Sequence, residues 1–228
     1  MPPPQMDREG ARIKSALDAQ GYVALRAWRP GVPADVLAAE IGPVERIRGI
    51  PLVQVLTSKP REASSPNLYS GNFGWDMFPL HTDLAHWFVP PRYFMLRCVQ
   101  GDPRALTALV PWSQALNEIS ETDIALARFR PRKSVRGRIH LLPFQHELGG
   151  TVLHRWDSVF LVPDNDAARR VARVLTGRQE EGTRHALEKA GDTLIVDNWR
   201  VLHGRSAVAA DSRRMIERVY IREINFDG

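Results

Sequence analysis

Cysteine is nearly absent from this chain of 228 residues: Cys98 is the only one, so no disulfide can form within the chain. A protein without disulfides is typical of a reducing compartment, and we expect a cytoplasmic location. The N-terminal segment has no apolar stretch of the kind found in secretory signals. No run approaches the roughly 18 consecutive apolar residues of a membrane-spanning helix, so we expect no membrane span.

Blocks of basic residues are also missing, although the formal net charge is +5. The positive charge is mostly arginine scattered along the chain. The densest region, residues 127–138, lacks the interleaved aromatic residues of a single-strand platform and matches no DNA-binding motif. We interpret it as a solvated basic face or the wall of an anion-binding pocket, and we do not expect nucleic-acid binding. That alternative would require steeply salt-dependent binding and no metal.

Short segments with the composition of β-strands recur along the whole chain, whereas helical spacing is confined to a few segments. No internal repeat or low-complexity linker divides the sequence, and its length fits one large β-rich domain. We therefore predict a single domain over residues 1–228, mainly β with helices (α+β). The expected architecture is a jelly-roll, cupin-like barrel with flanking helices. The expected helices are 9–19, 33–42, 112–129 and 163–177, and the expected strands are 21–28, 51–57, 92–99, 105–110, 151–156, 158–162, 183–188, 192–198 and 215–223.

Residues 58–80 form the longest stretch without strand or helix periodicity. The segment is rich in Ser, Pro, Asn and Gly, with several aromatic residues among them. A loop this long inside a compact domain is usually functional or disordered, and the aromatic residues argue against disorder. Because the segment leads directly into His81, we predict a lid over a site. Tyr69, Asn72 and Trp75 are its candidate substrate contacts.

The pattern His81-Thr82-Asp83, followed much later by His203, supplies the donor set of a metal site. Side chains at i and i+2 of a strand point to the same face, so His81 and Asp83 can reach one ion. His203 comes 120 residues after Asp83 and would complete the set from another strand. Two imidazoles and one carboxylate form the facial triad that holds non-haem Fe(II) and leaves positions open. His86 is the nearest rival ligand, but its spacing of five residues from His81 puts it off that strand face.

Two arginines on one face of the last expected strand extend this hypothesis. Arg214 and Arg218 fall about 13 Å apart at ~3.3 Å per residue. An arginine buried in a barrel needs an anionic partner, and its planar fork suits a carboxylate. The pattern indicates an oxygenase that uses iron and a keto acid. Alternatively, the two arginines are exposed or pair with Glu217 and Glu223.

Together these segments resemble the taurine dioxygenase and clavaminate synthase-like superfamily of Fe(II)/2-oxoglutarate oxygenases. The resemblance rests on HTD after a lid-like segment, PP-R-Y, VDNWRVLHGR and RRMIER, between about residues 69 and 223. It implies a double-stranded β-helix fold with His81, Asp83 and His203 as iron ligands. It also implies that Arg214 binds the distal carboxylate of 2-oxoglutarate, with the hydroxyl of Thr107 on the same carboxylate.

The resemblance further implies a reaction in which O2 and 2-oxoglutarate are consumed, succinate and CO2 are released, and an unactivated C–H bond is hydroxylated. Asp83 argues against halogenation, because halide replaces this carboxylate in related halogenases. Desaturation, cyclisation and epoxidation remain open, as does a jelly-roll enzyme that uses the same metal without redox chemistry. Arg218, with Arg155 as a second candidate, predicts a small anionic or zwitterionic substrate, such as an amino acid or a natural-product intermediate.

Overall fold

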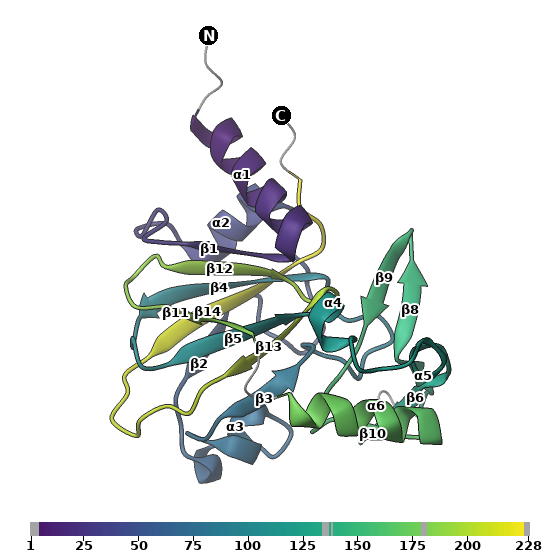
Figure 1. Cartoon of the computed structure of the whole chain (residues 1–228). Coiled ribbons are helices and arrows are strands. Elements are labelled where there is room, and N and C mark those ends of the chain that lie inside the picture. Colours follow the sequence, from purple (N-terminus) through teal and green to yellow (C-terminus); the bar gives the residue numbers. More distant parts are fainter. Residues whose placement is uncertain (1–4, 134–136, 138, 179–181, 226–228) are drawn as a thin grey trace.

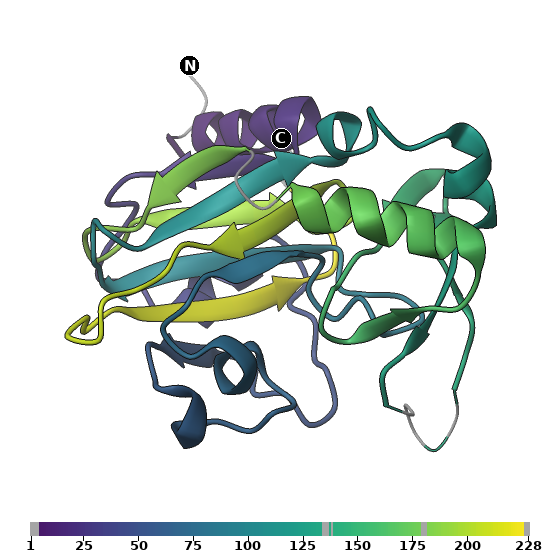
Figure 2. The same cartoon turned by 60° about the horizontal axis from the view of Figure 1, so that its bottom comes forward.

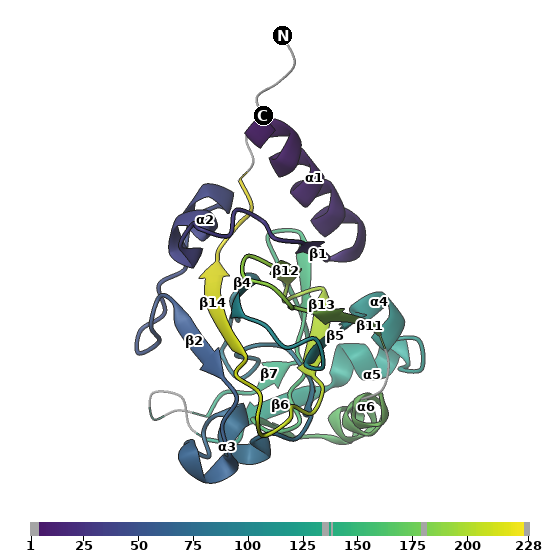
Figure 3. The ribbon, with the colours of Figure 1, turned by 90° about the vertical axis from the view of Figure 1, so that its left-hand side faces the viewer.

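Two antiparallel sheets face each other and enclose the interior of the molecule (Figures 1 and 3). The computed structural model describes residues 5–133, 137, 139–178 and 182–225. The five-stranded sheet has the order β1 (Tyr22–Leu25), β12 (Thr193–Asp197), β4 (Tyr93–Gln100), β14 (Met215–Ile221) and β2 (Gln54–Thr57). The four-stranded sheet has the order β11 (Thr183–Ala186), β5 (Leu106–Pro111), β13 (Val201–Arg205) and β3 (Phe78–His81).

The five-stranded sheet is buried on both faces, as β4 illustrates. Phe94 and Leu96 pack into the space between the two sheets, whereas Met95 packs into a separate cluster on the outer face. Two helices, α1 (Gln5–Gln20) and α2 (Ala34–Ile41), cover that outer face (Figure 1). Because both faces are covered, β4 and β12 are continuous apolar runs in the sequence.

An additional layer, at the right of Figure 1, is built from the chain between β5 and β11. Its core is continuous with one end of the four-stranded sheet, since Leu80 and Leu202 share a cluster with Phe129, Phe144 and Val171. The sheet of this layer has the order β10 (Leu161–Pro163), β6 (Arg128–Pro131) and β7 (Leu142–Pro143), next to a hairpin of β8 (Gln145–Leu148) and β9 (Thr151–His154). Its helices are α4 (Trp112–Ala115), α5 (Glu121–Leu126) and α6 (Asp166–Gly177).

The two facing sheets confirm the predicted jelly-roll with helices, although β3 (Phe78–His81) and β13 (Val201–Arg205) of the four-stranded sheet were not among the expected strand ranges. The predicted single helix over residues 112–129 is wrong. Two short helices lie there because the Ser120 side chain caps a new helix by accepting from the Asp123 backbone N–H at 3.1 Å, and the chain continues as β6. None of the helices within the described ranges is long and apolar enough to cross a membrane.

Candidate active site

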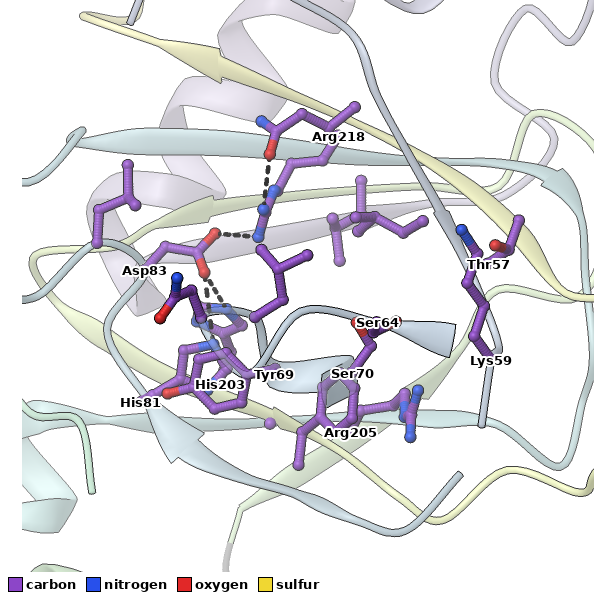
Figure 4. A pocket seen from close by; sticks show the side chains of 18 of the residues that line it. Thr57, Lys59, Ser64, Tyr69, Ser70, His81, Asp83, His203, Arg205 and Arg218 are labelled. Carbon is purple, nitrogen blue, oxygen red and sulfur yellow. Dashed lines mark hydrogen bonds and ion pairs between the residues drawn. The ribbon is translucent and has the colours of Figure 1, made fainter. Parts of the chain in front are cut away.

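The two histidines of the predicted triad lie opposite each other on neighbouring strands. His81 ends β3 and is the direct partner of His203 on β13, with ring centroids 4.2 Å apart. Asp83 follows two residues after His81. Its Oδ1 lies 3.4 Å from Nε2 of His81 and 3.5 Å from Nε2 of His203 (Figure 4). All three side chains are buried, and one donor atom of each lies within 4.8 Å of the others.

Hydrogen bonds fix the orientation of these donors. Nδ1 of His81 lies 2.8 Å from the carbonyl oxygen of Pro79, which leaves Nε2 directed toward Asp83. The main chain of Asp83 is held by Asn198, whose Oδ1 accepts from the Asp83 N–H at 2.8 Å and whose Nδ2 donates to the Asp83 carbonyl at 3.1 Å. Leu84 comes next, with φ of 53°. The chain therefore leaves the strand after His81 in a turn that Asn198 stabilises.

Asp83 uses its two carboxylate oxygens differently. While Oδ1 faces the histidines, Oδ2 accepts from Nη1 of Arg218 at 2.7 Å and from the hydroxyl of Tyr220 at 3.0 Å. The other terminal nitrogen of Arg218 donates to Oε1 of Gln54 at 2.8 Å. Arg218 and Tyr220 lie on the same face of β14, as the alternation in the sequence predicted.

The charge states of Asp83 and His203 are those that bind a metal ion. Burial would raise the pKa of Asp83, but the Arg218 charge and the hydrogen bonds of the two histidines outweigh it and hold the pKa well below its usual range. Burial, with a contribution from the neighbouring His81, lowers the pKa of His203 to about 4. A carboxylate and a neutral imidazole are therefore present at neutral pH, and these are the ligand forms.

The triad opens into a cavity of about 550 Å³ that contains both residues assigned to the keto acid. Thr107 reaches it from β5, and Arg214 reaches it from the residue before β14. Arg214 is buried, yet its guanidinium makes no hydrogen bond or ion pair with any residue that the structure describes. A buried cation without a partner is costly, so this wall of the cavity is suited to a carboxylate ligand.

The predicted lid, residues 58–80, contains the short helices η1 (Arg61–Ala63) and α3 (Tyr69–Phe73), which lie below the strands of the barrel in Figure 2. Its Tyr69 lines the cavity, and the Tyr69 ring stacks on the imidazole of His81 with centroids 4.1 Å apart. Arg205, on β13, ties the segment to the barrel. It donates to the carbonyls of Gly74 at 3.0 Å and Asp76 at 2.7 Å.

Three residues predicted from the sequence to touch substrate lie elsewhere. Asn72 donates from Nδ2 to the carbonyls of Pro66 at 3.0 Å and Leu68 at 2.7 Å, so it stabilises the lid itself. Trp75 is 37% exposed, and neither residue lines the cavity. Arg155 has no exposed surface and also lies outside the cavity lining. The structure therefore gives Asn72 and Arg155 structural roles in place of the predicted substrate contacts.

Arg155 illustrates this correction. Its guanidinium donates to three main-chain carbonyls of the loop after Asp83. The acceptors are Ala85 at 3.0 Å, Trp87 at 2.6 Å and Phe88 at 2.9 Å. Arg155 thus holds the loop that directly follows Asp83.

Sequence reasoning missed Asp157, which lines the cavity and is 1% exposed. Its Oδ1 accepts from the backbone N–H groups of Val159 at 2.7 Å and Phe160 at 2.8 Å. Burial raises the pKa of Asp157, partly countered by His81. Burial and the adjacent Asp157 together raise the pKa of Tyr69 well above its usual value. The only signal in the sequence was an acidic residue directly after an apolar strand.

Comparison with known proteins agrees with this geometry. Residues 112–220 match the family model described as taurine catabolism dioxygenase TauD, TfdA family. The chain is 31% identical over 146 residues to L-lysine 3-hydroxylase of Catenulispora acidiphila, covering 57% of this chain and 40% of that protein. It is 27% identical over 165 residues to clavaminate synthase 2 of Streptomyces clavuligerus, covering 64% of this chain and 50% of that protein. The matches thus span half or less of these curated relatives.

Among solved structures, asparagine oxygenase in complex with Fe(II), 3-hydroxyasparagine and succinate is similar, with a TM-score of 0.70 and 20% identity. This similarity covers 96% of the present chain and 80% of that chain, so it extends to nearly all the elements described above. The family match over residues 112–220 and the shared fold support the resemblance to the taurine dioxygenase and clavaminate synthase-like superfamily of Fe(II)/2-oxoglutarate oxygenases.

Proposed function

We propose that this chain is an Fe(II)- and 2-oxoglutarate-dependent oxygenase that hydroxylates an unactivated C–H bond of a small amino acid or related zwitterion, with release of succinate and CO2. One observation carries the proposal. The buried donors His81, Asp83 and His203 share a cavity with the buried, unpaired Arg214. A hydrolase or isomerase using the same metal donors would have no use for Arg214.

The residues present fit an iron ion and a keto acid. His81, Asp83 and His203 offer two imidazole nitrogens and one carboxylate oxygen, the donor set that Fe(II) oxygenases use. Arg214, with the hydroxyl of Thr107 in the same cavity, fits the distal carboxylate of 2-oxoglutarate. When bound, the iron and keto acid supply the oxygen activation and C–H cleavage that amino-acid side chains cannot perform.

The protein's own residues would position the reactants and exclude water. Tyr69 and the lid cover one side of the triad, and Leu84, Leu96 and Phe160 supply apolar walls. Asp157 supplies a buried carboxylate on the same side as Tyr69, suited to an ammonium or amide group of the substrate. Among the substrate contacts predicted from the sequence, Tyr69 and Arg218 line the cavity and remain candidates.

The substrate class rests on the size of the cavity, its mixed charges and the similarity to amino-acid oxygenases. The similar proteins are described as acting on lysine and asparagine, which supports a free amino acid or a derivative. Desaturation, cyclisation and epoxidation would use the same residues and are distinguished by product analysis. Cys98 is buried and free, in keeping with a reducing, cytoplasmic location.

The proposal is tested by anaerobic titration of the metal-free protein with Fe(II) and 2-oxoglutarate. We expect a weak visible charge-transfer band from the iron chelate, lost in His81→Ala and Asp83→Ala and weakened in Arg214→Gln. Arg173→Gln, at an exposed position of α6, is the matched control and should keep the band. Absence of the band in folded wild-type protein would contradict the oxygenase assignment. A screen of amino acids for succinate release would then identify the substrate.

A further inference from the structure

One oxygen of the metal carboxylate is held from a neighbouring strand. Arg218 and Tyr220 are two residues apart on β14, so both side chains point to the same face. Both bond to Oδ2 of Asp83, at 2.7 Å from the arginine and 3.0 Å from the phenol. Tyr220 is 3% exposed, so its hydroxyl is shielded from competing water.

The side chain of Arg218 is in turn held by Gln54. Gln54 on β2 is the direct strand partner of Arg218 and accepts from its second terminal nitrogen at 2.8 Å. The guanidinium carbon also lies 5.1 Å from the centre of the Tyr220 ring. Gln54, Arg218 and Tyr220 therefore form one connected network that ends on Oδ2 of Asp83 (Figure 4 shows the Arg218 contacts).

The main chain of Asp83 has equally little freedom. The Asn198 amide bonds both the N–H and the carbonyl of Asp83. It also donates to the Pro91 carbonyl at 2.9 Å, which attaches it to a further loop. With backbone and Oδ2 both held, Oδ1 is the oxygen that remains directed at the two histidine nitrogens.

We propose that Tyr220 and Arg218, supported by Gln54, are positioning residues that make Asp83 a ligand through one oxygen only. In this chain the guanidinium of Arg218 then acts on the metal carboxylate, in addition to lining the cavity. The inference rests on the proposed metal site and adds how that site is kept open. A second carboxylate oxygen on the ion would take one of the three positions that a facial triad leaves for keto acid and oxygen.

The test compares two matched tyrosine substitutions. Tyr220→Phe removes only the phenolic hydroxyl that bonds Asp83. Tyr93→Phe is the control, because Tyr93 is also buried, lies on the adjacent β4, and is the strand partner of Ile221. Metal-free protein is titrated with Co(II), which reports affinity and coordination through its visible absorption spectrum. Thermal unfolding of the metal-free variants measures whether either substitution harms the fold.

We expect Tyr220→Phe to weaken Co(II) binding by about 10-fold, the lower end of the usual effect of losing a ligand's hydrogen-bond partner. The absorption spectrum should also change, whereas Tyr93→Phe should leave affinity within about twofold of wild type and the spectrum unchanged. A well-folded Tyr220→Phe with wild-type affinity and spectrum would overturn the inference. Should Tyr220→Phe unfold, Gln54→Met tests the same network through the bond between Gln54 and Arg218. We expect this variant to lose less Co(II) affinity than Tyr220→Phe. An unchanged Co(II) affinity would overturn the inference.

Arg218 is tested separately, by measuring metal and substrate binding in the same variant. Arg218→Gln should weaken Co(II) binding at least as much as Tyr220→Phe. Unchanged Co(II) affinity together with weakened substrate binding would make Arg218 a substrate anchor and refute its positioning role. If the wild-type protein bound neither Co(II) nor Fe(II), the proposed function itself would fail. If the wild type binds metal but the variants bind it equally well, only the positioning role fails.

Discussion

Among single residues, Arg214 combines deep burial with the absence of an anionic partner anywhere in the described part of the chain. Burial lowers the pKa of Arg214, partly opposed by Cys98 and Asp102, but an arginine remains charged at neutral pH. The cost of burying this charge is offset when a carboxylate ligand enters the cavity. A ligand whose carboxylate reaches Arg214 would therefore bind more tightly than one that is too short to reach it.

Replacing Arg214 by Gln should weaken 2-oxoglutarate binding by about 10- to 100-fold, because a hydrogen bond to a charged group contributes roughly 1.5–3 kcal/mol. The measurement is the dissociation constant of 2-oxoglutarate in the presence of Fe(II), by anaerobic titration. Metal affinity should be unchanged, and Arg173→Gln should match the wild type. Unaltered 2-oxoglutarate affinity would refute the assignment of Arg214.

Arg155 should matter for stability. Arg155→Met removes the donor to three carbonyls of the loop after Asp83, of which that of Ala85 is buried and those of Trp87 and Phe88 are partly buried. We expect a loss of about 1.5–3 kcal/mol in the free energy of unfolding, the usual contribution of hydrogen bonds to a charged group. Urea unfolding measures it, with Arg173→Met on the surface of α6 as the control. A loss below about 1 kcal/mol would contradict this role.

The sequence predicted the three triad residues better than it predicted the residues that line the cavity. Order and spacing were enough to bring His81, Asp83 and His203 together, because strand pairing aligns the histidines. Order and spacing did not predict the position of Asn72. Its side-chain amide hydrogen-bonds to carbonyls of its own loop and does not line the cavity. Whether a polar side chain in a loop faces a ligand or a nearby carbonyl depends on turn geometry, which composition does not encode.

At the scale of secondary-structure elements, Arg205 links the lid to the strand that carries His203. Its guanidinium bonds two lid carbonyls and lies 3.7 Å from the centre of the Phe78 ring. Burial, with the charge of Arg214 nearby, lowers the pKa of Arg205 to about 10, so it stays charged at neutral pH. Arg205 is therefore one of the side chains that hold residues 58–80 against the barrel, together with Arg132, which donates to the Pro66 carbonyl at 3.1 Å.

Arg205→Gln should loosen the lid and speed its cleavage by a protease specific for aromatic residues, mapped by mass spectrometry. The new cuts should fall within residues 58–77, and Arg173→Gln should digest like the wild type. Added Fe(II) and 2-oxoglutarate should slow lid cleavage in the wild type. Cleavage insensitive to both the substitution and the ligands would count against a lid.

The elements that the sequence predicted are those with a strong hydrophobic pattern. Strands β4 and β12 lie between two apolar layers, and α6 has one apolar face, so each was predicted close to its observed position. Strand β8 was missed because its residues, QHEL, are mostly polar and none of them is buried in a two-stranded hairpin. A strand without a buried face does not show the alternation of apolar and polar residues by which strands are predicted.

For the whole molecule, the buried His203 and the half-buried His154 make stability depend on pH. Burial lowers the pKa of His154 to about 4, between Trp112 and Phe144, and the pKa of His203 is also about 4. Unfolded histidine titrates near 6.5. Between these values the unfolded chain binds more protons, so stability is fully present above about pH 6.5 and declines as the pH falls toward 4.

The metal-free protein should therefore lose unfolding free energy between pH 6.5 and 4, by at most about 1.4 kcal/mol per pH unit for each histidine. Urea unfolding at several pH values measures the slope. His154→Phe should flatten it, whereas His140→Gln, at an exposed position, should leave it unchanged. An equal slope in His154→Phe would show that other groups govern the acid limit.

At the same scale, composition and strand count predicted a jelly-roll but not the layer between β5 and β11. That layer packs through Phe129, Phe144 and Val171 against the end of the four-stranded sheet. Contacts between segments so far apart depend on shape complementarity of whole elements, which a local pattern does not contain. The similarity to solved structures over 96% of the chain is the finding that supports the complete topology.

Strand β3 is the outermost strand of its sheet, and it carries one of the three metal donors while Asp83 follows it. An ion held by His81, Asp83 and His203 would cross-link this edge to β13 and close a loop of 120 residues between Asp83 and His203. Without the ion, the edge is held by few hydrogen bonds, and a released edge is a template for pairing with other chains. Iron supply would then govern how long the folded protein persists in the cell, in addition to whether it is active.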